Sequence, residues 1–254
     1  MTSGTTLDAR SGAPSSTELL QALRVAQPRN GYLAYHAPRY ALLLRILDAY
    51  IRPQFRVLDI GRSHLTQLIA GRYGVQVDSL GFDPDGTFAT GRHYQFDLNE
   101  SQSPDNWRTD VSDYDTVVMA EVIEHLHTSP TRVLACVRRM VKDGGILILQ
   151  TPNAVALHKR LKMIVGRNPY ELIREDITDP GHFREYTRRE LVEYASSAGF
   201  TVEQTVMGSY FDYRYIRHSH TTLTKRSYLN VVNYAYKCLP AGVQPGITLV
   251  LRAS

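Results

Sequence analysis

Apolar and polar residues alternate along the chain in blocks that predict strands and helices in turn. Short apolar runs typical of buried strands occur at residues 55–60, 75–82, 93–96, 114–120, 146–150, 200–207 and 246–251. Apolar residues at helical spacing occupy 32–51, 65–73, 132–141, 154–165 and 188–198. Strands that alternate with helices favour a mostly parallel sheet covered on both faces. We therefore expect an α/β fold of the doubly wound, Rossmann-like type, with an antiparallel C-terminal strand.

Three segments fall outside this alternation. Residues 1–18 are rich in Ser, Thr, Gly and Ala and hold few large apolar side chains, so we predict a disordered tail. Residues 19–254 are expected to form a single domain with helical lid insertions at about 153–180 and 208–245. The second insertion is too long for a hairpin loop, and it contains a helix-like stretch.

The amino-acid composition is that of an ordinary globular protein and excludes few classes of protein. The chain has 254 residues, of which 43% are hydrophobic and 21% charged, which is the ordinary globular range. A net charge of +4 does not by itself predict a nucleic-acid or anionic-membrane partner. Two cysteines, Cys136 and Cys238, argue against a disulfide framework. Because no apolar run approaches the ~20 residues that cross a bilayer, we expect a cytoplasmic protein with no membrane partner.

Polar residues follow each predicted strand, where an open parallel sheet binds its ligand. After the first five strands in turn stand Asp59 to His64, Gly81 to Asp83, Asp97 to Asn99, Ala120 to His125, and Thr151 to Asn153. Because the carboxyl ends of parallel strands meet at one edge of a sheet, these groups are expected to converge on a single ligand site.

The order and spacing of these motifs, together with the turn at Asp143, Gly144 and Gly145, resemble a class I S-adenosylmethionine-dependent methyltransferase. The resemblance covers about residues 32–200. It implies S-adenosyl-L-methionine as the cofactor, bound by Asp59, Gly61, Arg62, Ser63, Asp83, Asp97, Leu98, Ala120 and Glu121. The loop after Gly61 holds fewer glycines than is usual in the family, which leaves the contacts to the methionine end of the cofactor open.

Physical chemistry supports part of this assignment. Gly61 lets the backbone approach a ligand without a Cβ, and the helix predicted from about Leu65 points free N–H groups toward it. Asp83 stands 22 residues beyond Gly61, about where doubly wound folds place an acid that binds ribose hydroxyls. Two structural alternatives stay open: Asp83 as a turn former before Pro84, and Asp97 as a helix N-cap.

A metal site is the second chemical hypothesis. Glu121, Glu124 and His125 would share one face if a helix begins where the fourth strand ends, and apposed carboxylates favour a divalent cation between them. With His182, these residues resemble those of the small-RNA 3′-terminal ribose 2′-O-methyltransferases and the catechol-methylating enzymes of ubiquinone synthesis. The resemblance implies that Glu121, Glu124, His125 and His182 hold a divalent metal, such as Mg²⁺ or Mn²⁺. A mixed oxygen and nitrogen set suits Mn²⁺, Fe²⁺, Co²⁺ or Zn²⁺ better than Mg²⁺.

Two mechanisms follow from these residues. With a metal, two neighbouring hydroxyls of the acceptor would chelate the ion, which activates one oxygen for in-line attack on the sulfonium methyl. Without a metal, His125 or His182 would serve as the general base. The structural alternative is that Glu124, His125 and His182 only bond to the backbone near the edge of the sheet.

The sequence indicates the chemical class of the methyl acceptor less clearly than it indicates the cofactor. The second insertion mixes aromatic and basic side chains, which could bind a sugar, an aromatic ring with a phosphate or carboxylate, or single-stranded RNA. The low net charge favours a small hydroxyl-bearing acceptor, such as a vicinal diol, sugar or catechol. An RNA ribose 2′-O-methyltransferase and a non-catalytic protein that binds the cofactor or a partner stay as alternatives. The sequence does not indicate an oligomeric state.

Overall fold

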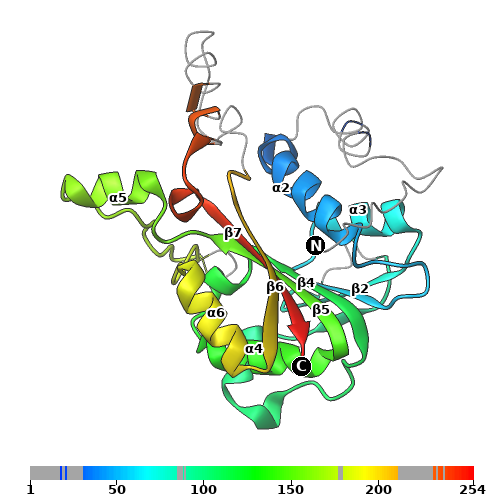
Figure 1. Cartoon of the computed structure of the whole chain (residues 1–254). Helices are drawn as coiled ribbons and strands as arrows, with labels where there is room; N and C mark the ends of the chain where they lie inside the picture. The colour runs from blue at the N-terminus through cyan, green and yellow to red at the C-terminus, as the bar shows by residue number, and fades with distance from the viewer. Residues whose placement is uncertain are drawn as a thin grey trace, which may run out of the picture.

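The computed structural model describes residues 18, 21, 31–84, 88, 90–176, 180–210, 231, 232, 234–236 and 238–254. Within this part of the chain, one seven-stranded sheet has the order β3-β2-β1-β4-β5-β7-β6 (Figure 1). The strands are β1 (Val57–Ile60), β2 (Val77–Gly81), β3 (His93–Gln95), β4 (Tyr114–Ala120), β5 (Val141–Pro152), β6 (Phe200–Gly208) and β7 (Gly246–Ala253). The α-helices are α2 (Gly31–Leu47), α3 (His64–Tyr73), α4 (Pro130–Met140), α5 (Leu157–Ile164) and α6 (Arg188–Ser197). Short 3-10 helices are η1 (Leu98–Gln102), η2 (Pro104–Asn106), η3 (Ile123–His125) and η5 (Ala241–Val243).

The pairing of the strands confirms the predicted fold class. Neighbouring strands from β3 to β5 pair in parallel. β7 lies between β5 and β6 and is antiparallel to both. The result is the Rossmann-like arrangement with an antiparallel C-terminal strand that the alternation of apolar and polar blocks predicts.

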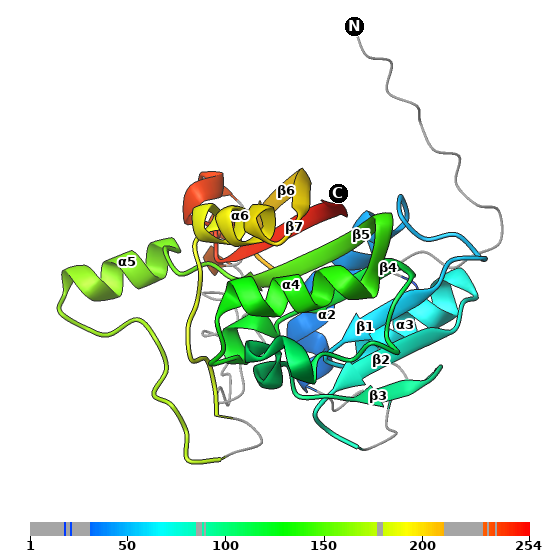
Figure 2. The same ribbon diagram turned by 90° about the horizontal axis from the view of Figure 1, so that it is seen from below.

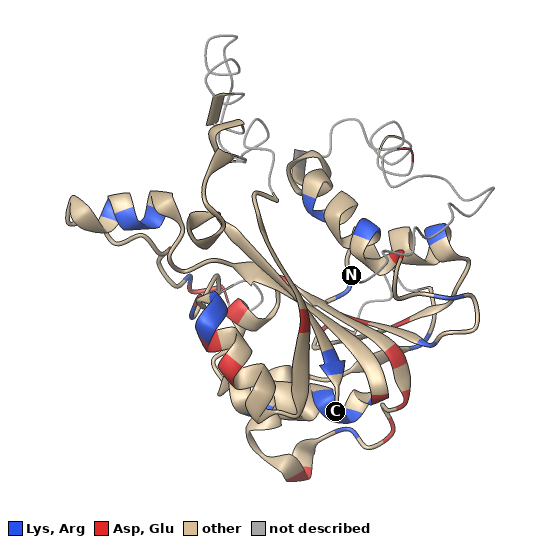
Figure 3. Cartoon of the chain, in the orientation of Figure 1, with Lys and Arg blue, Asp and Glu red and all other residues tan. Residues whose placement is uncertain are grey.

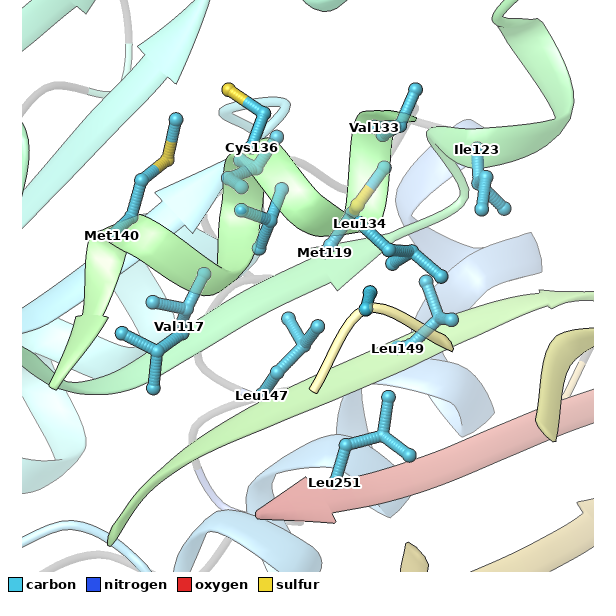
Figure 4. Close-up of a cluster of buried hydrophobic side chains, with 14 of the residues drawn as sticks. Val117, Met119, Ile123, Val133, Leu134, Cys136, Met140, Leu147, Leu149 and Leu251 are labelled. Carbon is cyan, nitrogen blue, oxygen red and sulfur yellow. The ribbon is translucent and has the colours of Figure 1, made fainter. Parts of the chain in front are cut away.

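Helices cover both faces of the sheet, as Figure 2 shows. On one face α4 and α6 pack over a core that includes Leu134, Leu147 and Leu251, with the side chains between α4 and the strands visible in Figure 4. On the other face α2 and α3 pack over a second core that includes Tyr40 and Ile148. β4 and β5 belong to both cores because their alternate residues point to opposite faces.

The element boundaries differ from the predicted ones in two informative places. α2 ends at Leu47 rather than near Ile51, and it continues through Pro38. β5 begins at Val141 rather than at Ile146. A register shift in its pairing with β4 accommodates the intervening residues, including Gly144 at φ 72°, so the predicted Gly144 turn is a bulge within the strand.

Parts of the predicted domain organisation cannot be compared with the structure. The tail at 1–17 and residues 211–230 of the second insertion lie outside the described residues. The first insertion contains α5, as predicted. Among the described helices, none has the length and apolar character needed to cross a bilayer.

Candidate functional site

The loop after β1 is shaped by Gly61. Its φ of 80° lies in the left-handed region, and a Cβ at this position would come within 2.5 Å of Val122 Cγ2. A glycine is therefore needed for the loop after β1 to approach the loop after β4. This close approach brings the predicted cofactor loop to the edge of the sheet where β4 also ends.

The same loop leads into a well-capped helix. Ser63 is the N-cap of α3: its hydroxyl accepts from the Leu65 N–H, and the Ser63 N–H donates to Thr66 Oγ1. Thr66 Oγ1 also donates to Asp59 Oδ2 at 2.6 Å. Burial raises the pKa of Asp59 to about 7, with the Thr66 hydrogen bond and the charge of Arg39 opposing the rise. Through this hydrogen bond to Thr66, Asp59 helps to fix the first turn of α3.

Arg62 joins the ends of β1 and β2. Its Nη2 donates to the Asp83 carbonyl at 3.2 Å and lies 3.7 Å from Asp83 Oδ2. His93 also contacts the Asp83 carbonyl, at 2.8 Å from its Nε2. The Asp83 carboxylate is largely exposed at the edge of the sheet, which is the position predicted for an acid that binds ribose hydroxyls.

Asp97 performs the structural role that the sequence left open. Its Oδ1 accepts from the Asn99 backbone N–H at 2.9 Å and from Asn99 Nδ2 at 3.1 Å, which caps η1. It also lines a cavity of about 370 Å³ with Phe82, Gln95, Phe96, Glu100, Asn106 and Arg108. Leu98 is instead buried in the core beneath α4. Asp97 is thus both a cap and part of the wall of a cavity at the β3 edge.

An ion pair occupies the centre of the edge, where β4 ends. Arg39 of α2 places its Nη1 3.6 Å from Glu121 Oε2; the Arg39 side chain is buried and that of Glu121 is mostly buried. The charge of Arg39 opposes the rise in pKa that burial causes at Asp59, Glu121 and Glu124. Ala120, the last residue of β4, packs against the core on the α2 side. α2 therefore supplies the positive charge for three buried carboxyl groups.

The predicted helix at the end of β4 is not formed. Glu121 has φ 58°, in the left-handed region, and only the single turn η3 follows it. Since no α-helix begins there, the spacing of Glu121 does not place it in the cluster of Glu124 and His125, although its charge still acts on Glu124. It lies with Arg39 instead of in the cluster that these two residues form.

The structure brings three of the four predicted metal ligands together. One potential ligand atom from each of Glu124, His125 and His182 lies within 4.8 Å of the others. The two imidazole rings have centroids 4.8 Å apart and meet edge to face. His182 lies 57 residues beyond His125 in the chain, so this juxtaposition is a product of the fold.

Backbone hydrogen bonds hold the two segments in register. The Phe183 N–H donates to the Glu124 carbonyl at 2.8 Å, and the Ala154 N–H donates to the Tyr186 carbonyl at 3.0 Å. Thr187 then caps α6 in a capping box with Glu190, which fixes where the segment ends. The His182 segment is thus pinned along the ends of β4 and β5.

Each histidine of the cluster uses its Nδ1 in a hydrogen bond. His125 Nδ1 lies 2.9 Å from the Gly181 carbonyl, and His182 Nδ1 lies 3.1 Å from Glu185 Oε1. Both partners accept hydrogen bonds, so each Nδ1 carries a proton. Burial, with the neighbouring His125, lowers the pKa of His182 to about 4 and keeps its ring neutral. A metal-ligating histidine commonly has this arrangement.

Glu124 is the most deeply placed member of the cluster. Its side chain is fully buried, and its Oε2 accepts from Thr151 Oγ1 at 2.8 Å. Its Oε1 is buried and has no hydrogen-bond partner among the described residues. Burial, and then the charge of Glu121, raises the pKa of Glu124 well above its usual range. A cation beside Oε1 would give this oxygen the partner that it lacks. It would also lower the free-energy cost of burying the charged carboxylate.

Three contacts that support the site were not predicted from the sequence. Glu185 orients His182, and Lys159 of α5 forms an ion pair with Glu185. Thr151 fixes the Glu124 carboxylate. The sequence signal for Thr151 was its place after β5. Lys159 and Glu185 belong to no recognisable sequence motif. Lys159 is distant from His182 in the chain, and only the fold brings it close.

Comparison with known proteins defines the class of this protein. A family model described as a methyltransferase domain matches residues 20–205, which is most of the chain. A probable S-adenosylmethionine-dependent methyltransferase of Mycolicibacterium smegmatis is 35% identical over 92 residues, which cover 36% of this chain and 30% of that relative. The chain therefore belongs to the methyltransferase-domain family, the class of S-adenosylmethionine-dependent methyltransferases.

Solved structures agree on the fold. A methyltransferase of Archaeoglobus fulgidus aligns with a TM-score of 0.54 at 15% identity, covering 91% of this chain and 98% of that one. The geranyl diphosphate C-methyltransferase of Streptomyces coelicolor A3(2), solved with Mg²⁺, geranyl diphosphate and S-adenosyl-L-homocysteine, aligns at 0.52 and 11% identity, over 98% of this chain and 89% of its own. At these identities the likeness concerns the fold alone.

Proposed function

We propose that this protein transfers the methyl group of S-adenosylmethionine to a hydroxyl oxygen of a small acceptor, and that a divalent metal at Glu124, His125 and His182 assists the transfer. Two observations carry the proposal: a carboxylate oxygen of Glu124 lies within 4.8 Å of a ring nitrogen of each histidine, and the buried Glu124 Oε1 lacks a hydrogen-bond partner among the described residues. Glu121 leaves the predicted ligand set because it pairs with Arg39.

The residues present fit a divalent metal. Two imidazole nitrogens and one carboxylate oxygen form a mixed donor set that suits Mn²⁺, Fe²⁺, Co²⁺ or Zn²⁺. The Nδ1 hydrogen bonds of both histidines and the Thr151 bond to Glu124 would orient the three ligand atoms. When bound, the metal would act as a Lewis acid that lowers the pKa of an acceptor hydroxyl.

The chain's own residues would then position the two substrates. Gly61 would let the loop after β1 approach the cofactor, the N-terminal end of α3 would offer the positive end of its dipole, and Asp83 would offer a carboxylate at the β2 edge. Arg39 keeps Glu121 paired between the cofactor loop and the histidine cluster. Because three protein ligands leave coordination positions open, an acceptor with two neighbouring hydroxyls suits this centre best.

The RNA alternative has less support. It depends on aromatic and basic residues of the second insertion, most of which lie at 211–230, outside the described residues. Of the insertion's tyrosines, Tyr210 is buried, with its hydroxyl bonded to the Val206 carbonyl and accepting from Thr248. Tyr210 therefore packs the insertion onto the sheet and is not available to stack on a base.

Calorimetry tests the metal centre directly. Full-length protein treated with a chelator would be titrated with Mn²⁺ in saturating S-adenosylhomocysteine. We expect one-to-one binding that weakens at least tenfold in His182→Ala, while His127→Ala, an exposed histidine outside the cluster, binds as the wild type does. Absence of binding in the wild type, or equal binding by His182→Ala, would reject the metal centre.

A paired acceptor panel tests the chemistry of transfer. Each vicinal diol or catechol would be assayed beside its singly hydroxylated analogue, with radiolabelled S-adenosylmethionine and added Mn²⁺. Turnover restricted to the diol members and abolished by chelator is the expected result. Turnover of both members without metal would instead support a histidine base.

A further inference from the structure

Helix α5 presents its side chains in the reverse of the usual order. Lys159 is only 6% exposed, whereas Leu161, Ile164 and Val165 are 53%, 79% and 68% exposed. An ordinary surface helix turns its apolar stripe to the core and its charged residues to water. Here the lysine faces the protein and the aliphatic residues face outward.

The helical period explains how one short helix does this. At 3.6 residues per turn, Leu161, Ile164 and Val165 fall within one arc, with Arg160 and Lys162 on either side of it. Lys159 falls opposite this arc. The outer side of α5 is therefore an aliphatic stripe bordered by two cations, which we call the α5 stripe.

Specific contacts hold the stripe outward. Lys159 forms an ion pair with Glu185, and its ammonium lies 5.7 Å from the centre of the Tyr170 ring. Arg160 Nε donates to the Val155 carbonyl at 2.8 Å, at the start of the helix. Because Glu185 is buried beside His182, turning the stripe inward would break the ion pair and leave a carboxylate buried without its cation.

The loop after the helix adds two exposed apolar side chains. Leu172 and Ile173 are 86% and 60% exposed. Residues 157–170 contain four Lys and Arg residues and no Asp or Glu, whereas residues 171–176 of the loop contain one Arg and three acidic residues. In both ribbon views α5 projects away from the sheet, and Figure 3 shows basic but no acidic residues along it (Figures 1 and 2).

We infer that the α5 stripe docks onto an anionic lipid surface. Aliphatic side chains bordered by Lys and Arg are what a helix needs to lie in a membrane interface, with the apolar arc in the acyl boundary and the cations at the phosphates. A purely apolar partner would not account for the cations, and an acidic partner would not account for the aliphatic arc. This inference does not depend on the proposed metal or acceptor, and it replaces the expectation of no membrane partner.

The location of the stripe connects lipid docking to the site. Lys159 and Glu185 link α5 to His182 through two side-chain contacts. Docking would therefore set the carboxyl edge of the sheet close to the lipid headgroups. An acceptor that resides in the membrane would reach the site without crossing bulk water.

Vesicle flotation tests the inference with the full-length chain. Vesicles of phosphatidylcholine with 30% phosphatidylglycerol would be compared with pure phosphatidylcholine, at low and high salt. We expect flotation with the anionic vesicles, at least tenfold weaker binding to neutral ones, and loss at high salt. Ile164→Gln and the pair Arg160→Gln with Lys162→Gln should each reduce binding at least fivefold.

A matched control separates docking from general hydrophobicity. Val231 is also an exposed aliphatic residue, at 65%, so Val231→Gln should float as the wild type does. Circular dichroism and thermal unfolding would establish that all variants fold. The inference would be overturned if the wild-type protein did not bind anionic vesicles. So would a wild-type dimer that Ile164→Gln converts to a monomer, because the stripe would then be a contact between two copies.

Discussion

Arg39 and Glu121 form a mostly buried ion pair between helix α2 and the end of strand β4, with 3.6 Å between Nη1 and Oε2. The Arg39 guanidinium also lies over the ring of Tyr40, at 5.1 Å. Since its charge lowers the pKa of Asp59 in β1 and of Glu121 and Glu124 after β4, Arg39 acts on carboxyl groups from two different strands. α2 is thus an integral part of the site and does more than cover the sheet.

Removing this cation should destabilise the protein. We expect Arg39→Met to lower the free energy of unfolding by about 3 kcal/mol, because Glu121 would be left buried without its cation. Urea unfolding of the wild type and the variant measures the loss. The double variant Arg39→Met with Glu121→Met should recover most of it, and a single variant as stable as the wild type would contradict a tightly buried pair.

Asp59 should make stability depend on pH. Burial raises its pKa to about 7, from an ordinary value of 3.8, so the folded state holds a proton that the unfolded state has released between these values. The Asp59 contribution to stability is therefore present below pH 3.8 and is lost as the pH rises to about 7.

The matching variant isolates this contribution. Asp59→Asn cannot titrate, yet its amide oxygen can still accept from Thr66. Its stability relative to the wild type should increase by up to about 4 kcal/mol between pH 4 and pH 8, since the shift is about three pKa units and one unit corresponds to about 1.4 kcal/mol. Denaturant unfolding at both pH values measures the change, and a constant difference would argue against a raised pKa.

Gly61 should tolerate no larger residue. Gly61→Ala would meet Val122 Cγ2 at 2.5 Å and would force a side chain into a left-handed conformation. We expect a loss of about 1 to 3 kcal/mol in stability and weaker binding of S-adenosylhomocysteine in calorimetry. Val122→Ala in the same background should recover only the part that comes from the clash. Gly71→Ala, where a Cβ meets nothing within 4 Å, is the matched control.

Glu185 should tune the proposed metal centre without being a ligand. Its Oε1 holds His182 Nδ1 at 3.1 Å, so Glu185→Met, which removes this acceptor, should weaken Mn²⁺ binding by about 10- to 100-fold. Glu193→Met, at an exposed glutamate on α6, should leave the affinity unchanged. Unchanged affinity in Glu185→Met would show that the hydrogen bond does not position His182.

The sequence predicts the sheet better than the site because the two depend on different information. β4 matches its predicted range to the residue, since a run of apolar residues needs only burial to become a strand. The spacing of Glu121, Glu124 and His125 suggested a helix, but Glu121 takes a left-handed conformation at the strand end. Residue spacing alone carries no signal for that backbone geometry.

Contacts between side chains that are distant in the sequence were the hardest to predict. The pairing of His125 with His182 was proposed from a family resemblance, and the structure does bring them together. The Lys159 pair with Glu185 and the Arg39 pair with Glu121 had no such guide. Each joins a helix to a distant loop or strand end, and charge alone does not select one carboxylate among many.

The position of β7 has a consequence for how the chain assembles. Residues 246–253 lie between β5 and β6, so both antiparallel pairings of the sheet wait for the last strand to be synthesised. Until then, the facing edges of β5 and β6 have no ladder partner and can pair with another chain. Folding in the cell should therefore finish only after translation of this strand, and shortened products are the ones most at risk of aggregation.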